Sequence, residues 1–136
     1  MQQMQRELFA FLGAVRFFTR IPVSCRVPHS NEYLNHSARY FPAVGVLVGA
    51  LSAIAFSIAL LFLPLSIAIL IAMATSIYIT GAFHEDGLSD MTDGLGGGWE
   101  KMRILEIMKD SRVGSYGAIA IAMALPGAGA LAQAAD

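Results

Sequence analysis

Charged residues are scarce in this sequence of 136 residues: 14% are charged and 56% are hydrophobic. That share is too low for an ordinary soluble domain. No Asp, Glu, Lys, Arg or His stands between Arg39 and His84. A transmembrane helix needs about 20 apolar residues, so this interval is long enough for two. The composition therefore predicts an all-α, multi-pass transmembrane protein.

Other scarcities exclude further classes. The one cysteine, Cys25, permits no internal disulfide bond and is too isolated for a thiolate metal site. The arginines are spread along an apolar segment, so no nucleic acid is expected as a partner. Arg16 and Arg20 interrupt the first apolar run, which argues against a cleavable signal peptide. Residues 1–40 are instead expected to form an interfacial or cytoplasmic segment of one membrane domain, 1–136.

The predicted spans are 43–62 and 65–83, with Pro64 breaking the helix between them to give a helical hairpin. A third span is predicted at 115–135. Lys and Arg stand on both flanks of the hairpin, and its turn has none. The positive-inside rule therefore places the loop and helix of 84–114 in the cytoplasm.

The run "HEDGLSDMTDG" follows the apolar interval directly. If it continues the second helix, Asp90 lies roughly 40° and Asp93 roughly 20° from Asp86 around the axis, and His84 roughly 160° away. Three carboxylates at the negative end of a helix need a positive partner. Oxygen ligands without cysteine favour Mg²⁺ or Mn²⁺. A solvated acidic helix end is the alternative interpretation.

A glycine-rich stretch and an amphipathic helix over 99–110 come next. Lys109 and Arg112 stand at the end of that helix, where they are expected to contact phosphate; a snorkelling anchor is the alternative for Arg112. Acidic metal ligands beside basic side chains favour chemistry on a diphosphate, in which a carboxylate or a histidine takes a proton from the attacking hydroxyl. A membrane cation-binding or transport subunit is the competing function.

Four stretches carry a resemblance: "TRIPV", "RYFPAVGVLVGA", "FHEDGLSDMTDGLGGG" and "RILEIMKDSRVGSYG". Together they closely resemble the cobalamin synthase family, the adenosylcobinamide-GDP ribazoletransferases. The resemblance implies a multi-pass enzyme of the bacterial inner membrane with its active loop in the cytoplasm. It also implies a reaction of adenosylcobinamide-GDP with α-ribazole or its 5′-phosphate, which gives adenosylcobalamin or its 5′-phosphate, releases GMP and requires Mg²⁺.

Matched residue by residue, the resemblance makes Asp86, Asp90 and Asp93 the metal ligands, and Lys109 and Arg112 the phosphate contacts. His84 and Asp93 are the catalytic candidates. Glu85 is expected to matter less, because an acid is not required at its position in the family.

Members of the family are commonly longer than this chain and have further spans. A C-terminal truncation is therefore expected. The short chain would then be active alone or as a homo-oligomer, or it would be an inactive remnant of the enzyme.

Overall fold

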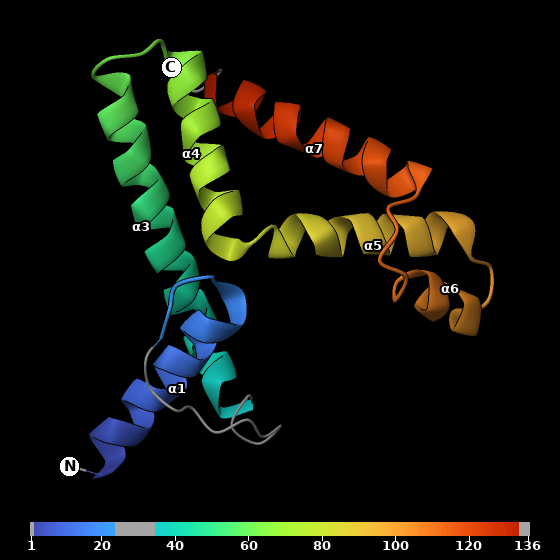
Figure 1. Ribbon diagram of the computed structural model, residues 1–136, viewed down its shortest axis with the longest axis horizontal. Coiled ribbons are helices and arrows are strands. Elements are labelled where there is room, and N and C mark those ends of the chain that lie inside the picture. The colour runs from blue at the N-terminus through green and yellow to red at the C-terminus, as the bar shows by residue number, and fades with distance from the viewer. Residues whose placement is uncertain (1, 24–34, 134–136) are drawn as a thin grey trace.

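The computed structural model describes residues 2–23 and 35–133, and every regular element in these ranges is a helix (Figure 1). The all-α expectation is therefore confirmed for the described residues; Cys25 lies outside them. The elements are α1 (Gln2–Phe18), the 3-10 helix η1 (Ala38–Tyr40), α3 (Phe41–Leu60), α4 (Leu65–Thr80), α5 (Phe83–Gly97), α6 (Lys101–Ile107) and α7 (Ser115–Gln133).

Helices α3 and α4 form the expected antiparallel hairpin. Proline sets the start of both helices, because its fixed φ suits a first turn and its missing N–H would have no partner there. Pro42 stands in the first turn of α3, and Pro64 is the N-cap of α4. The amide of Leu63 donates to the carbonyl of Ala59 at 2.9 Å and closes the end of α3. The hairpin agrees with the two apolar stretches read from the sequence.

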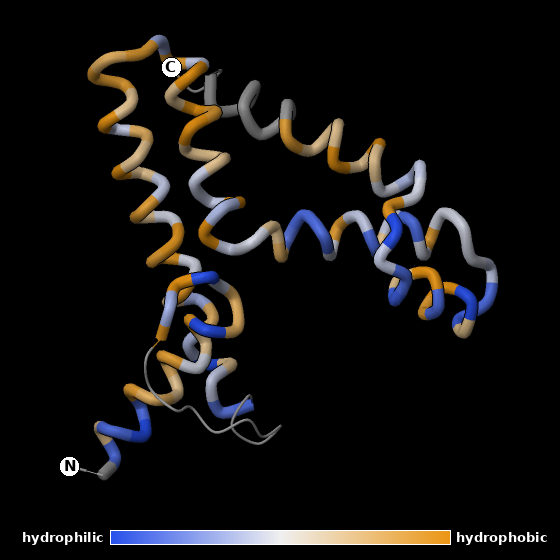
Figure 2. The backbone as a smooth tube through the Cα atoms, in the orientation of Figure 1, coloured by the Kyte–Doolittle hydropathy of each residue, from blue (hydrophilic) through white to orange (hydrophobic). Residues whose placement is uncertain are grey.

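One helical segment in the described ranges, Asn35–Leu60, is long and apolar enough to cross a membrane by itself. Only 17% of its most apolar window is buried, whereas the core helix of a soluble protein is mostly buried. Figure 2 shows the apolar character of the hairpin. Helices α4 and α5 pass the same test only as a pair, bent by 84°. The multi-pass arrangement stays a prediction.

The bend contradicts the expectation that the acidic run continues the second helix. Helix α4 ends at Thr80, and Gly81 and Ala82 both adopt the left-handed conformation, with φ of 68° and 62°. The Ala82 amide still donates to the carbonyl of Ile77 at 2.9 Å. This left-handed cap ends the backbone hydrogen bonding of α4. Helix α5 then begins nearly at a right angle to α4.

Arg20, from the segment after α1, contacts the bend between α4 and α5. Its backbone amide donates to the carbonyl of Ile79 at 2.7 Å. A Cβ on Gly81 would lie 2.6 Å from its Nε, so any other residue there would force the Arg20 side chain to shift. The guanidinium stands at the negative end of α4, where a cation is favoured. The segment after α1 therefore helps to fix the direction in which α5 leaves.

The buried core joins α1 to α3. Ala14 and Val15 pack against Val44 and Val48, and aromatic rings extend this contact towards α5. At the other end of α1, Glu7 accepts a hydrogen bond from the Tyr40 hydroxyl at 2.6 Å and pairs with Arg39. These partners, the Tyr40 hydrogen bond first, lower the pKa of Glu7. The N-terminal segment is thus a packed helix.

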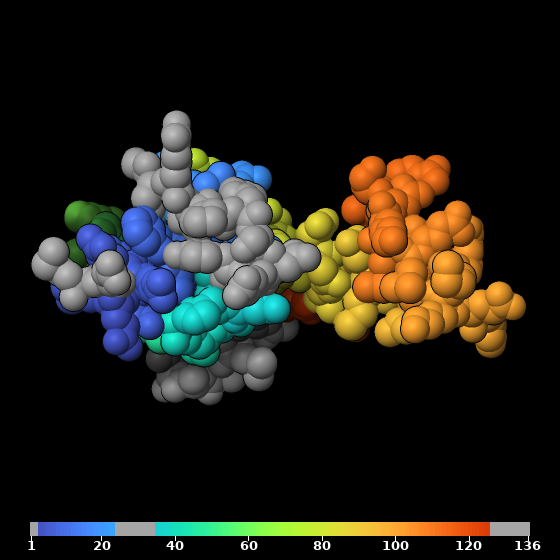
Figure 3. All heavy atoms as spheres, turned by 90° about the horizontal axis from the view of Figure 1, so that it is seen from below, coloured from blue at the N-terminus to red at the C-terminus, as the bar shows by residue number. Residues whose placement is uncertain are grey.

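Helix α5 leaves the hairpin as an arm that carries α6 at its far end and is covered by α7 (Figure 1). In the view from below, this arm projects from the body formed by α1 and α3 (Figure 3). Helix α6 is shorter than the amphipathic helix expected over 99–110. Trp99 is 99% exposed and the backbone of Glu100 is extended, so these two residues do not form the first turn of the expected helix.

Strain at the bend leads to a stability prediction. Ala82 has a φ of 62°, which costs a residue with a Cβ about 1–2 kcal/mol. Ala82→Gly is expected to raise the free energy of unfolding by about 0.5–1 kcal/mol, because the strain relieved exceeds the added entropy of the unfolded chain. Thermal unfolding in detergent measures the effect. The control, Ala74→Gly inside α4, should lower stability by about 1 kcal/mol; a lower melting temperature for both variants would contradict the strain.

Candidate active site

The acidic residues lie on α5, and its first turn carries Glu85 and Asp86. Anions are favoured at the positive N-terminal end of a helix. The expectation that they stand at the unfavourable end of the second helix is therefore wrong. The new helix start itself stabilises part of this charge, which the sequence argument assigned to a cation alone.

Asp86 and Asp90 are one turn apart on α5. Asp86 is exposed and Asp90 is partly exposed. Neither carboxylate forms a hydrogen bond or an ion pair with a residue that the structure describes. Like charges at this spacing repel each other. The pair is thus accessible and lacks a counter-charge, as a cation site requires.

Asp93 has a different environment. Its residue exposure is 8%, and both of its oxygens accept backbone hydrogen bonds from the start of α7. The Gly114 amide donates to Oδ2 at 2.7 Å, and the Gly117 amide donates to Oδ1 at 2.8 Å. These are amides that a helix start leaves without partners. Asp93 therefore caps α7 from the neighbouring helix.

Two glycines make this contact possible. A Cβ on Gly114 would collide with the Asp93 carboxylate, and a Cβ on Gly117 would collide with the same carboxylate and with the Ser89 hydroxyl. Ser89 is 4% exposed, and its Oγ is buried without a hydrogen-bond partner among the described residues. Sequence reasoning missed Ser89 and this role of the glycines. The spacing of Gly114 and Gly117, one turn apart at a helix start, was the available signal.

A pocket of about 570 Å³ opens beside this contact. Asp93, Arg103, Asp110 and Arg112 contribute to its wall. Arg112 holds Asp110 in a fork, with Nε 3.0 Å from each carboxylate oxygen and Nη2 2.6 Å from Oδ2. This hydrogen bonding lowers the pKa of Asp110 and raises that of Arg112. Arg112 thus faces the pocket already paired with an acid that the sequence analysis did not consider.

Lys109 does not line this pocket. Its side chain is exposed and forms no ion pair within the described part of the chain. Arg103 pairs with Glu106 of the same helix at 2.7 Å. Of the two predicted phosphate contacts, the structure brings Arg112 to the same pocket as Asp93 and leaves Lys109 outside it.

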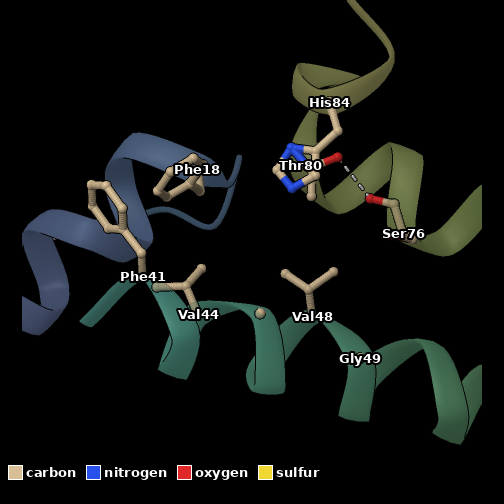
Figure 4. Close-up of a pocket in the computed structure, with 9 residues that line it drawn as sticks. Phe18, Phe41, Val44, Val48, Gly49, Ser76, Thr80 and His84 are labelled. Carbon is tan, nitrogen blue, oxygen red and sulfur yellow. Dashed lines mark hydrogen bonds between the residues drawn. The ribbon is translucent and has the colours of Figure 1, made fainter. Parts of the chain in front are cut away.

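His84 lines another pocket, of about 410 Å³, between α1, α3 and α4 (Figure 4). Its ring stands edge to face with Phe18, with 6.1 Å between ring centroids. It forms no hydrogen bond with the residues that the structure describes. The two catalytic candidates, His84 and Asp93, therefore line two different pockets.

The donor set can be tested against Mg²⁺. Within the described residues, no group of three or more His, Cys, Asp or Glu side chains is placed to hold a metal ion. Mg²⁺ usually takes one or two carboxylates, with waters and substrate phosphates as its other ligands. Asp86 and Asp90 offer two unpaired carboxylates on adjacent turns, so they fit this mode; Asp93 already has a hydrogen bond on each oxygen.

Comparison with known families decides the ancestry. The family model described as cobalamin-5-phosphate synthase matches residues 10–136. The chain belongs to the cobalamin-5-phosphate synthase family. The acidic run, the glycine pair and the Asp110–Arg112 fork all lie within the matched residues of this family member.

Several curated relatives are similar to this cobalamin-5-phosphate synthase family member, and each is named adenosylcobinamide-GDP ribazoletransferase. The protein of Shewanella amazonensis is 51% identical over 92% of this chain and 48% of its own length. Those of Vibrio parahaemolyticus and Vibrio cholerae are 54% and 50% identical over 89% of this chain and 45% and 46% of their own lengths. The chain thus spans about half the length of these relatives. No solved structure matches it.

Proposed function

We propose that this chain carries the diphosphate-binding part of an adenosylcobinamide-GDP ribazoletransferase. The observation that carries the proposal is the unpaired couple Asp86 and Asp90 on a chain about half identical to proteins of that name. The substrates would be adenosylcobinamide-GDP and α-ribazole or its 5′-phosphate. The products would be GMP and adenosylcobalamin or its 5′-phosphate.

In the proposed site, Asp86 and Asp90 would hold Mg²⁺. When bound, the ion neutralises charge on the phosphate oxygens and helps the leaving group depart. Asp93 contributes by fixing the start of α7 next to this helix, because both of its oxygens accept amides of that start. In this proposal Asp93 positions α7 and is not a metal ligand.

The chemical step is a substitution at phosphorus. A ribazole hydroxyl oxygen forms a bond to the phosphorus next to the cobinamide. The bond from that phosphorus to the bridging oxygen breaks, and GMP leaves with the electron pair. The hydroxyl proton passes to a base, for which His84 is the candidate because its ring nitrogens form no hydrogen bond with described residues.

Arg112 would bind the phosphate that departs with GMP. Its fork on Asp110 keeps the guanidinium at the pocket wall, so phosphate binding requires an exchange of one anion for another. Lys109 adds positive charge at the exposed end of the same segment without contacting the pocket.

The membrane arrangement belongs to the proposal. Helix α3 crosses the bacterial inner membrane, α4 returns through it, and the arm of α5 and α6 lies on the cytoplasmic side. The third span predicted at 115–135 falls on α7, although α7 packs mainly along α5 and less on the hairpin, and the lipid bilayer would surround the hairpin. A homo-oligomer would supply further helices around the substrate.

Release of GMP tests the proposal. Membranes that contain the 136-residue chain should release GMP from adenosylcobinamide-GDP when α-ribazole and Mg²⁺ are present. Addition of EDTA should stop the release. Cobalamin formed in step with GMP would support the transferase, whereas no release from a chain confirmed in the membrane would contradict turnover by this chain alone.

A further inference from the structure

The stretch "TRIPV" after α1 has no role in the site proposed above, yet its backbone is held in place. Thr19 is 9% exposed; its hydroxyl donates to the carbonyl of Val15 at 2.7 Å and accepts from the amide of Ile21 at 3.2 Å. Between them, the Arg20 amide donates to the carbonyl of Ile79 on α4 at 2.7 Å. The backbone of Arg20 is therefore fixed against the bend between α4 and α5.

The Arg20 side chain lies against the same bend without a partner among the described residues. A Cβ added to Gly81 would lie 2.6 Å from Nε and 3.3 Å from Cζ, so the guanidinium rests on this backbone. Arg20 is exposed and forms no ion pair or side-chain hydrogen bond with the residues that the structure describes. Arg112, in contrast, is already paired with Asp110. Arg20 thus offers N–H donors that no acid of the described chain occupies.

The end of α1 approaches α5 on the flank next to the carboxylate pair. Around the axis of α5, Phe83 lies about 60° from Asp86 and about 20° from Asp90. Its ring contacts the ring of Phe18, with centroids 5.2 Å apart. The residues just before Arg20 therefore pack near the side of α5 from which the two carboxylates project.

Arg20 also lies near the carboxylate pair along α5. The amide of Asp86 donates to the carbonyl of Ala82 at 2.8 Å, so one helical turn separates Asp86 from the bend. Four residues of helix extend about 6 Å along the axis. The Arg112 pocket meets α5 at Asp93, about 10 Å beyond Asp86. Asp86 thus lies between the two arginines along α5, and it is closer to the bend that Arg20 contacts.

We infer that Arg20 binds a phosphate of the diphosphate substrate beside Asp86 and Asp90. The inference rests on the proposed function. A guanidinium binds phosphate through two parallel N–H···O bonds, which a lysine ammonium does not form. Arg20 binds an anion without first releasing an acid, whereas Arg112 must exchange Asp110 for it. Because the backbone of Arg20 is already fixed, only its side chain is ordered on binding.

Arg20→Gln and Arg20→Lys test this contact. Equilibrium dialysis of inorganic pyrophosphate with Mg²⁺, on the purified chain in detergent, measures binding without turnover. Arg20→Gln should lower the affinity about tenfold or more, because hydrogen bonds from a charged group are lost. Arg20→Lys keeps a cation at the end of α4, so it should melt like the unaltered chain and recover only part of the affinity.

The matched control is Arg16→Gln. Arg16 is an exposed arginine in the last turn of α1 and has no ion pair in the described part of the chain. Its variant should bind pyrophosphate like the unaltered chain. Equal losses in Arg16→Gln and Arg20→Gln would show a response to net charge and would overturn the contact. Full recovery of affinity in Arg20→Lys would assign Arg20 a structural charge at the bend instead.

The inference and the proposed function fail in different ways. Affinity lost in folded Arg20→Gln, in a chain that releases no GMP, would support the phosphate contact and contradict turnover. GMP release with unchanged pyrophosphate affinity in Arg20→Gln would overturn the contact and leave the transferase. Absence of pyrophosphate binding by the unaltered chain would overturn the contact whether or not GMP is released.

A lipid headgroup carries the same phosphate chemistry, and a second measurement separates the two sources. Phosphatidylglycerol added to the detergent solution should change the melting temperatures of the unaltered chain and of Arg20→Gln alike. Stabilisation of the unaltered chain alone, with equal pyrophosphate affinity in both, would assign Arg20 to a lipid and contradict the inference.

Discussion

Asp90→Asn is expected to abolish turnover while the chain still folds and inserts into the membrane. Asp90 has no hydrogen bond or ion pair within the described chain, so its charge does not hold the fold together. A metal ion stabilises phosphoryl charge by several kcal/mol, and each 1.4 kcal/mol is about tenfold in rate, so the loss should be at least about 100-fold. The measurement is GMP release at saturating Mg²⁺.

The control for charge is Glu100→Gln. Glu100 is an exposed acid at the start of α6 and lines neither the pocket at His84 nor the pocket at Arg112. Its variant should retain full activity. Normal activity in Asp90→Asn would remove the metal hypothesis. Equal losses in both variants would show that the arm responds to net charge rather than to a ligand.

Asp93→Asn is expected to destabilise the fold as well as to impair turnover. One carboxylate oxygen becomes an NH₂ group that faces a backbone N–H, so one of the two bonds to Gly114 and Gly117 is lost. A hydrogen bond to a charged group contributes about 1.5–3 kcal/mol, and Asp93 is only 8% exposed. The melting temperature in detergent should fall by several degrees.

Asp86→Asn is the matched control, because it makes the same chemical change on the same helix at an exposed position without a partner. It should melt like the unaltered chain. Asp93→Asn that melts normally yet shows no activity would contradict the capping role and restore Asp93 as a metal ligand. The comparison therefore separates a residue that positions α7 from residues that bind the ion.

The sequence predicted the helical hairpin well because its signals are local and strong. An uncharged stretch and Pro64 fix two helices and the break between them. The bend after α4 was not predicted. Gly81 alone is compatible with a continuing helix, and the turn depends on a left-handed Ala82 and on Arg20 from a distant segment.

The acidic residues were identified from the sequence, but the difference between Asp93 and the other two aspartates was not. Helical periodicity puts Asp86, Asp90 and Asp93 on one face and treats them alike. Their difference comes from α7, which packs on α5 and presents two amides to Asp93 alone. Likewise, the pairing of Arg112 with Asp110 depends on the loop between α6 and α7, for which spacing gives no rule.

Because of the right-angle turn between α4 and α5, the height of α5 above the lipid and the spacing of its carboxylates depend on different helices. With α4 along the membrane normal, as proposed, the length of α4 sets the height of α5 above the lipid. One added helical turn would shift the whole arm by about 5.4 Å. The spacing of the carboxylates is set along α5 and would not change. Depth in the bilayer and geometry of the chemistry can thus be adjusted independently, through a two-residue joint.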